Sequence, residues 1–147
     1  MYKKYRKLKI LLIVLLVPGL FSLAVFANPD PKVVAVENYI EALNNKDIEF
    51  IKALYADNAT AEDPVGSEVL EGHAAVVALY ADGAFKSDLS AELTGPIRVA
   101  GNSAAFSFNL YVSGMKMEVI DVFEFNENNQ VTSLKAYWSL SNLSPNL

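Results

Sequence analysis

Met117-Glu-Val-Ile-Asp-Val-Phe-Glu-Phe125 has the alternation of a β-strand, with apolar side chains at its odd-numbered positions except for Asp121. Those positions share one face, because successive side chains of a strand point to opposite sides of a sheet. Residues 104–112 alternate in the same way. Ser113-Gly114, between the two stretches, indicates a tight turn. The pair therefore predicts two antiparallel strands joined by a short hairpin.

Further strands are predicted on both sides of this hairpin. Residues 89–93 alternate between apolar and polar types, and residues 97–99 resume an extended pattern after Gly95-Pro96. Beyond a hairpin loop at residues 126–129, a last strand is predicted over Val131–Trp138. The second half of the chain therefore reads as a run of antiparallel strands.

The preceding part of the chain has helical spacing instead. Apolar side chains recur at helical intervals over Val33–Leu43. A second helix is expected to begin near Asp47, which would cap it, and to include Tyr55. An extended piece over residues 59–66 and a third helix from Gly72 to about residue 80 follow. Helices first and strands second predict an α+β fold.

Asp121 is the anomaly of the central strand. It shares a face with apolar side chains, and no Lys or Arg lies on that face of the strand. A buried carboxylate without a partner is costly, so its pKa should rise and it should hold a proton, which makes it a hydrogen-bond donor. The alternatives are a strand in the flipped register, or a carboxylate that reaches a backbone amide or an exposed sheet edge.

Composition restricts the function. The chain has 147 residues, enough for one domain, with 52% apolar and 20% charged residues, which argues against disorder. It has no cysteine and one histidine, His73, which excludes a thiolate site and leaves too few ligands for a histidine zinc site. The net charge of -5 argues against nucleic acid as a partner. No metal or cofactor is expected.

The first 27 residues have the pattern of a secretory signal peptide. A basic start precedes an apolar run over residues 10–27. Ala27, with Val25 two positions before it, fits a small-x-small cleavage site. The alternative is an uncleaved anchor, because the run approaches the ~20 residues of a membrane span. Either way, the single domain of residues 28–147 is expected outside the cytoplasm, periplasmic or secreted.

Other candidate residues carry weaker signals. Asp63 lies in Glu62-Asp63-Pro64, where an Asp-Pro pair commonly starts a turn, but it is also placed to act as a general base at a pocket mouth. Tyr39 lies on the apolar stripe of the first helix, where a buried hydroxyl needs a partner. Tyr55, Tyr80 and Trp138 read as core aromatics that would supply flat apolar walls to a pocket.

Four segments in order resemble bacterial ketosteroid isomerase, over about residues 33–143. They are Asn38-Tyr-Ile-Glu-Ala-Leu-Asn44, Tyr55-Ala-Asp-Asn-Ala-Thr-Ala-Glu-Asp-Pro-Val-Gly66, Val119-Ile-Asp-Val-Phe-Glu-Phe125 and Ala136-Tyr-Trp-Ser139 with Asn142-Leu143. The resemblance implies a nuclear transport factor 2-like fold, in which three N-terminal helices wrap a curved mixed sheet into a cone around an apolar pocket. It also implies a homodimer.

The resemblance assigns roles to these residues. Asp63 matches the general base, and Tyr39 and a protonated Asp121 match the two donors to the substrate oxyanion. A carboxylic acid kept neutral by an apolar site is an established feature of that family, so the resemblance supplies this role. Tyr55 and Tyr80 match tyrosines that support the oxyanion-hole tyrosine. Trp138 matches a residue that lines the substrate pocket in that family.

The implied activity is that of a cofactor-independent steroid Δ5-3-ketone isomerase. Its apolar substrate, a steroid or similar enone, would have a C=C bond moved into conjugation with a ketone through a dienolate. Two alternatives stay open. One is an exported, non-catalytic binding module for an apolar ligand, and the other is a SnoaL-like cyclase or dehydratase, because one fold hosts several reactions.

Overall fold

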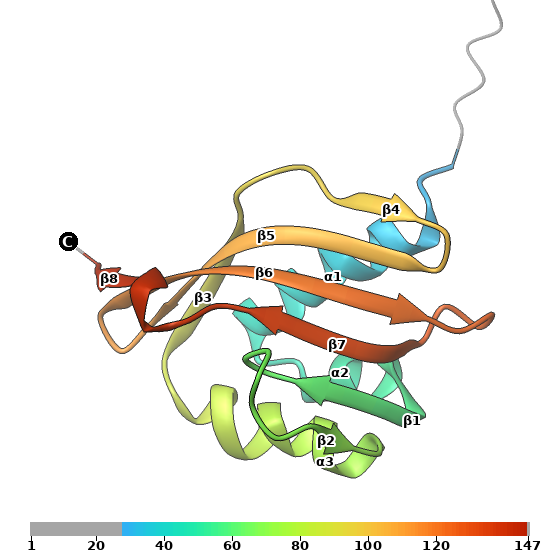
Figure 1. The fold of residues 1–147 in the computed structure, drawn as a ribbon, viewed down its shortest axis with the longest axis horizontal. Coiled ribbons are helices and arrows are strands. Elements are labelled where there is room, and N and C mark those ends of the chain that lie inside the picture. Colours follow the sequence, from blue (N-terminus) through green and yellow to red (C-terminus); the bar gives the residue numbers. More distant parts are fainter. Residues whose placement is uncertain (1–27, 147) are drawn as a thin grey trace, which may run out of the picture.

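A computed structural model describes residues 28–146 of the chain (Figure 1). The expected signal peptide, residues 1–27, lies outside the described residues. Within residues 28–146, no helix combines the length and the apolar character needed to cross a membrane.

Helix α1 (Pro31–Asn45) begins and ends where local chemistry favours it. The Asp30 carboxylate caps it by accepting from the backbone N–H of Lys32, and Pro31 occupies its first turn, where its missing N–H is no loss. Lys46 ends it in the left-handed conformation. The buried face carries Tyr39, which the stripe of apolar residues predicted.

Helix α2 (Ile48–Leu54) is capped by Asp47, as predicted, through a 3.0 Å hydrogen bond from the backbone N–H of Phe50. Its predicted extent was wrong at the other end. Tyr55 leaves the helical conformation and begins strand β1 (Tyr55–Glu62). This strand pairs in parallel with β7 (Val131–Tyr137), a distant partner that local sequence spacing does not reveal.

Helix α3 (His73–Ala78) begins one residue after Gly72 and continues into a π-helical turn, Leu79–Gly83, and a 3₁₀ turn, Ala84–Lys86. The predicted third helix therefore forms, but its last turn is widened at Tyr80. A π-helical turn redirects the side chains that follow it, and such turns are frequent at functional sites. Here it holds the buried Tyr80 side chain.

The strands form one mixed sheet in the order β2-β1-β7-β6-β5-β3, with β4 paired to β5 and β8 paired to β6. The bounds of the remaining strands are β2 (Leu70–Glu71), β3 (Leu89–Leu93), β4 (Arg98–Ala100), β5 (Ser103–Val112), β6 (Met115–Phe125) and β8 (Leu143–Pro145). The predicted hairpin is confirmed as β5 and β6, joined at Ser113-Gly114 with positive φ angles. The two short strands β2 and β8 were not predicted.

The sheet is curved and the helices lie on one of its faces (Figure 1). The core fills the space between them, where the ring centroids of Phe123 and Tyr39 are 5.0 Å apart and those of Phe123 and Phe106 are 5.1 Å apart. Edge-to-face contacts of this kind favour a dense apolar interior. The predicted α+β class, with helices wrapped on a curved mixed sheet, is confirmed.

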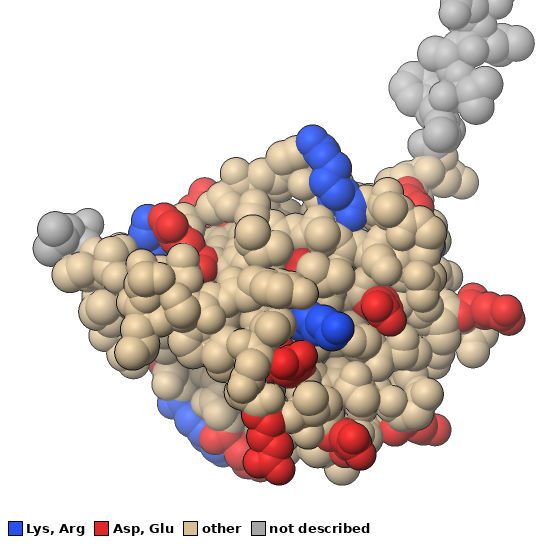
Figure 2. Space-filling model, viewed as in Figure 1, with Lys and Arg blue, Asp and Glu red and all other residues tan. Residues whose placement is uncertain are grey.

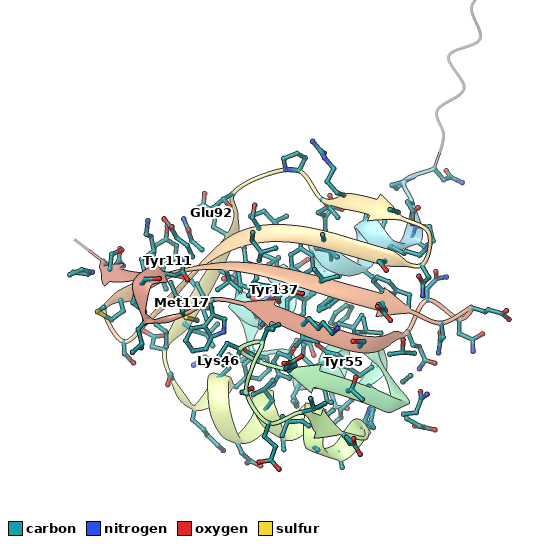
Figure 3. The ribbon with its side chains drawn as sticks, in the orientation of Figure 1. Lys46, Tyr55, Glu92, Tyr111, Met117 and Tyr137 are labelled. Atoms are coloured by element: carbon teal, nitrogen blue, oxygen red, sulfur yellow. The ribbon has the colours of Figure 1, made fainter. Side chains whose placement is uncertain are left out.

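The other face of the sheet is turned away from the helices. Ile120 and Tyr137, cross-strand partners on β6 and β7, are about half exposed there, at 49% and 48%. Figure 3 labels the side chain of Tyr137. Figure 2 shows acidic side chains scattered over this side of the molecule among few basic ones. The alternation along β6 thus places Ile120 outside and Asp121 inside the fold.

Candidate active site

Asp121 lies in the middle of β6, with its side chain in the core. It is 2% exposed, and its neighbours on the adjacent strands are Phe106 on β5 and Ala136 on β7. The predicted face of the strand is therefore the observed one, and the flipped register is excluded. Among the described residues, its Oδ1 is the one buried side-chain oxygen or nitrogen without a hydrogen-bond partner.

The surroundings of Asp121 favour its neutral form. Burial raises the pKa of this carboxyl well above its usual range, and the negative charge of Asp63 raises it further, whereas the hydrogen bond from Tyr39 lowers it. None of the ion pairs formed within residues 28–146 includes Asp121. A neutral carboxylic acid can donate its proton in a hydrogen bond, and within residues 28–146 the Oδ1 atom has no hydrogen-bond partner.

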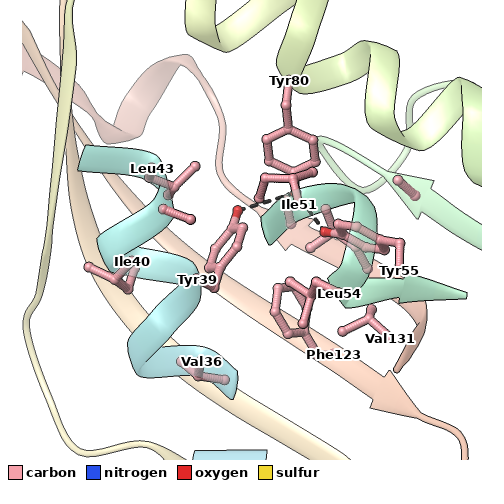
Figure 4. Packing of buried hydrophobic residues seen from close by; sticks show 14 of the residues in the cluster. Val36, Tyr39, Ile40, Leu43, Ile51, Leu54, Tyr55, Tyr80, Phe123 and Val131 are labelled. Carbon is pink, nitrogen blue, oxygen red and sulfur yellow. Dashed lines mark hydrogen bonds between the residues drawn. The ribbon is translucent and has the colours of Figure 1, made fainter. Parts of the chain in front are cut away.

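The hydroxyl groups of Tyr39, Tyr55 and Tyr80 form a chain of hydrogen bonds in the core (Figure 4). Tyr55, at the start of β1, shares a 2.6 Å hydrogen bond with Tyr80. Tyr80 donates to the hydroxyl of Tyr39 at 3.4 Å, and Tyr39 donates to Oδ2 of Asp121 at 3.5 Å. The last two bonds are longer than the about 2.5–3.0 Å that is usual between two hydroxyl or carboxyl oxygens, so they are weaker than the bond between Tyr55 and Tyr80.

The tyrosines remain protonated at neutral pH. Burial is the largest effect that raises the pKa of Tyr39 well above its usual value, and Asp121 raises it further once it is ionised. Burial also raises the pKa values of Tyr55 and Tyr80 well above the usual value. Each hydroxyl therefore keeps a proton that it can donate. Tyr39, at the Asp121 end of the chain, and Asp121 itself form a pair of adjacent donors.

Asp63 follows directly after β1 and is only partly buried. Trp138, the residue after β7, donates from its indole Nε1 to Oδ1 of Asp63 at 2.5 Å. Burial raises the pKa of Asp63, whereas the indole hydrogen bond lowers it. Asp63 thus ionises more easily than Asp121, because it is less completely buried and because its hydrogen bond from the indole is shorter than the 3.5 Å bond that Asp121 receives from Tyr39.

Hydrogen bonds join the six predicted site residues into two groups, one of Tyr39, Tyr55, Tyr80 and Asp121 and the other of Asp63 and Trp138. The negative charge of Asp63 raises the pKa of Asp121. His73 lies apart, at the start of α3, where its Nε2 meets the backbone oxygen of Lys52 at 2.8 Å. The sequence did not predict the hydrogen bond between Trp138 and Asp63. The two residues are 75 positions apart, and no local sequence pattern links them.

The arrangement combines three chemical abilities. Asp63 can accept a proton as a carboxylate, and Tyr39 and neutral Asp121 can donate hydrogen bonds to one oxygen atom. Donors fixed in a buried, apolar site stabilise a developing negative charge more strongly than donors in water. The set suits proton abstraction next to a carbonyl group, in which charge builds up on the carbonyl oxygen.

The sequence of this chain is similar to a known domain family and to a curated protein. The model of the SnoaL-like domain matches residues 36–134. A steroid Delta-isomerase of Nocardioides simplex is 39% identical over 110 residues, which cover 71% of this chain and 87% of that protein.

Solved structures resemble the fold closely. The epoxide hydrolase/cyclase-like enzyme SalBIII, with a role in pyran ring formation in the polyether salinomycin, has a TM-score of 0.73 at 23% identity, covering 78% of this chain and 95% of its own. RV0760c from Mycobacterium tuberculosis has a TM-score of 0.71 at 19% identity, covering 78% and 99%. At these identities the structural likeness establishes the fold and leaves the reaction to the site residues.

Proposed function

This chain is a ketosteroid isomerase-like member of the SnoaL-like domain family, and on that basis we propose that it isomerises a β,γ-unsaturated ketone, a 3-oxo-Δ5-steroid or a similar apolar enone. The family resemblance of the sequence motifs is thereby confirmed. The observation that carries the proposed reaction is the buried Asp121, with an unpartnered Oδ1 beside the hydroxyl of Tyr39.

The proposed reaction moves one proton within the substrate. Asp63, as a carboxylate, removes the proton from the carbon between the carbonyl group and the C=C bond. The electron pair of that C–H bond shifts to form a dienolate, and negative charge collects on the carbonyl oxygen. Tyr39 and neutral Asp121 donate hydrogen bonds to this oxygen and lower the barrier. Protonated Asp63 then returns the proton to the far end of the former C=C bond.

The two carboxyl groups have opposite tasks, which their surroundings support. Asp63 is partly buried and receives the indole hydrogen bond, so it ionises and acts as the base. Asp121 is buried more completely, and the charge of Asp63 further favours its neutral form. Asp63 carries the substrate proton between the two steps, and both carboxyl groups are back in their original states at the end of the cycle, which consumes no cofactor and no second substrate.

The direct test is the ultraviolet absorption of the conjugated enone after the purified protein is mixed with a Δ5-3-ketosteroid. We expect the band to grow at a rate proportional to protein concentration. Saturable binding of the steroid without growth of the band would contradict the isomerase and identify a module that binds apolar ligands. A steroid that neither binds nor reacts would favour a SnoaL-like cyclase or dehydratase.

The proposal also concerns the cellular location and the oligomeric state of the protein. We infer that the protein acts outside the cytoplasm, periplasmic or secreted, because its sequence begins with a signal-peptide pattern. A mature protein whose mass starts at Asn28 would support cleavage, and an intact mass would support an anchor. We also propose a homodimer, formed through the sheet face that carries Ile120 and Tyr137.

A further inference from the structure

We propose that Glu62 is a positioning residue, which holds the loop of Asp63 in place through the backbone N–H of Gly66. This inference rests on the proposed function, because it concerns the base of that reaction. The Oε1 atom of Glu62 accepts from the N–H of Gly66 at 2.6 Å. A short bond to a charged acceptor is among the stronger hydrogen bonds in proteins.

The bond closes the loop around the base. Glu62 is the last residue of β1, and Gly66 lies four residues further on, so their bond spans Asp63, Pro64 and Val65. The turn within it has a second bond, from the N–H of Ser67 to the oxygen of Pro64 at 2.9 Å. The carboxylate of the proposed base thus projects from a segment whose ends are joined by the side chain of its neighbour.

Two further contacts hold the loop to β7 and to the residue that follows it. The N–H of Val65 donates to the oxygen of Ala136 on β7 at 2.8 Å, and Trp138 donates to the Asp63 carboxylate. The side chain of Val65 is 40% exposed, so little apolar packing adds to these bonds. The bond of Glu62 is therefore the side-chain hydrogen bond that joins the two ends of the loop.

Loss of the hydrogen bond between Glu62 and Gly66 should lower the reaction rate much more than it lowers the stability of the fold. Both Glu62 and Gly66 are accessible to water, so water replaces the lost bond and the net effect on folding is small. The base, in contrast, must reach the substrate C–H within a narrow range of positions. A misplacement of about 1 Å costs as much as about 10²-fold in rate.

Three substitutions separate the hydrogen bond from the charge. Glu62→Gln keeps the length and an acceptor oxygen but loses the charge, whereas Glu62→Asp keeps the charge and loses the reach. Glu62→Ala loses both. We expect kcat for a Δ5-3-ketosteroid to fall by between about 10-fold and 10²-fold in the Asp and Ala variants, with KM nearly unchanged, and Glu62→Gln to restore most of the rate.

The exposed Glu71→Ala on β2 is the matched control and should behave as the wild type. Equal kcat in the wild type and in Glu62→Asp would overturn the role of Glu62. The same holds if Glu62→Gln loses as much as Glu62→Ala, because charge would then be the cause. Lack of turnover in the wild-type protein would instead overturn the proposed function. The hydrogen bond between Glu62 and Gly66 can then still be tested, because its loss in Glu62→Asp should speed hydrogen exchange at the Gly66 amide.

Discussion

At the scale of single residues, the burial of Asp121 links the stability of the protein to pH. Burial raises the pKa of this carboxyl well above its unfolded value, so the folded chain keeps the proton at a pH where the unfolded chain loses it. The stabilising effect of this proton is complete below the unfolded pKa of about 4 and is lost as pH rises towards the folded pKa.

Asp121→Asn should remove this dependence, because an amide is neutral in both states. The wild type should lose up to about 1.4 kcal/mol of unfolding free energy per pH unit above pH 4 through this one group. We therefore expect the stability of Asp121→Asn relative to the wild type to increase from pH 4 to pH 7, measured by urea unfolding. A difference independent of pH would contradict a neutral Asp121.

The two proposed oxyanion donors make a second prediction at this scale. Tyr39→Phe and Asp121→Ala each remove one donor and should lower kcat by about 10²- to 10³-fold in the steroid assay. Asp121→Asn should lose less than Asp121→Ala, because its amide can still donate. Asp63→Asn should lose most, because a neutral amide cannot take the substrate proton. Full turnover in Asp63→Asn would contradict the assignment of the base.

Trp138 should set the pH at which the enzyme becomes active. Its indole hydrogen bond lowers the pKa of Asp63 against the effect of burial. Trp138→Phe keeps an aromatic ring but removes the donor, so the pKa of Asp63 should rise. Since Asp63 must be ionised to accept a proton, the acidic limb of the kcat/KM profile should move to higher pH. An unmoved limb, or one moved to lower pH, would show that the indole does not control the base.

At the scale of elements, the position of α1 determines where Tyr39 lies, and one side chain fastens the end of this helix to the sheet. Asn44 donates to the oxygen of Ala91 at 3.0 Å and accepts from its N–H at 2.7 Å. Ala91 belongs to β3, which ends the strand order of the sheet. The amide thus satisfies backbone groups that an edge strand leaves free, which also shields the edge from other chains.

Asn44→Ala should therefore destabilise the protein by about 1–2 kcal/mol, because two hydrogen bonds to a buried residue are lost. The measurement is the midpoint of urea unfolding at constant pH. Asn45→Ala, at the exposed neighbouring position of the same helix, is the control and should have a much smaller effect. Similar losses in the two variants would indicate a change in helix propensity alone.

At the scale of the whole molecule, the two faces of the sheet have different roles. The inner face packs against the helices and carries Asp121, and the outer face exposes Ile120 and Tyr137 side by side. Large apolar side chains gathered on one surface are typical of an interface between proteins. This placement supports the proposed homodimer.

Ile120→Glu should weaken the dimer, because it puts a charge where two copies would exclude water. We expect the mass from light scattering or sedimentation to fall towards that of a monomer, with unchanged secondary structure by circular dichroism. Lys52→Glu, on α2 behind the sheet, should leave the mass unaltered (Figure 1). A wild-type protein that is already monomeric would contradict the proposed dimer.

Periodicity and turn chemistry determined much of the fold in advance. The alternation along residues 117–125 was enough to place Asp121 on the inner face, and the helical stripe was enough to place Tyr39 there. Caps at Asp30 and Asp47 are also local features, because each carboxylate bonds to a backbone N–H two or three residues away. Such features depend on neighbours in the sequence, so the sequence alone determined them.

Only the tertiary structure decided which of these groups meet. Tyr55 became a strand residue because β7, far along the chain, pairs with it, and the hydroxyl of Tyr39 reaches Asp121 across 82 residues of sequence. The indole bond between Trp138 and Asp63 also depends on how β1 and β7 lie in the curved sheet. Contacts of this kind arise from the path of the whole chain, and no local period of side chains encodes them.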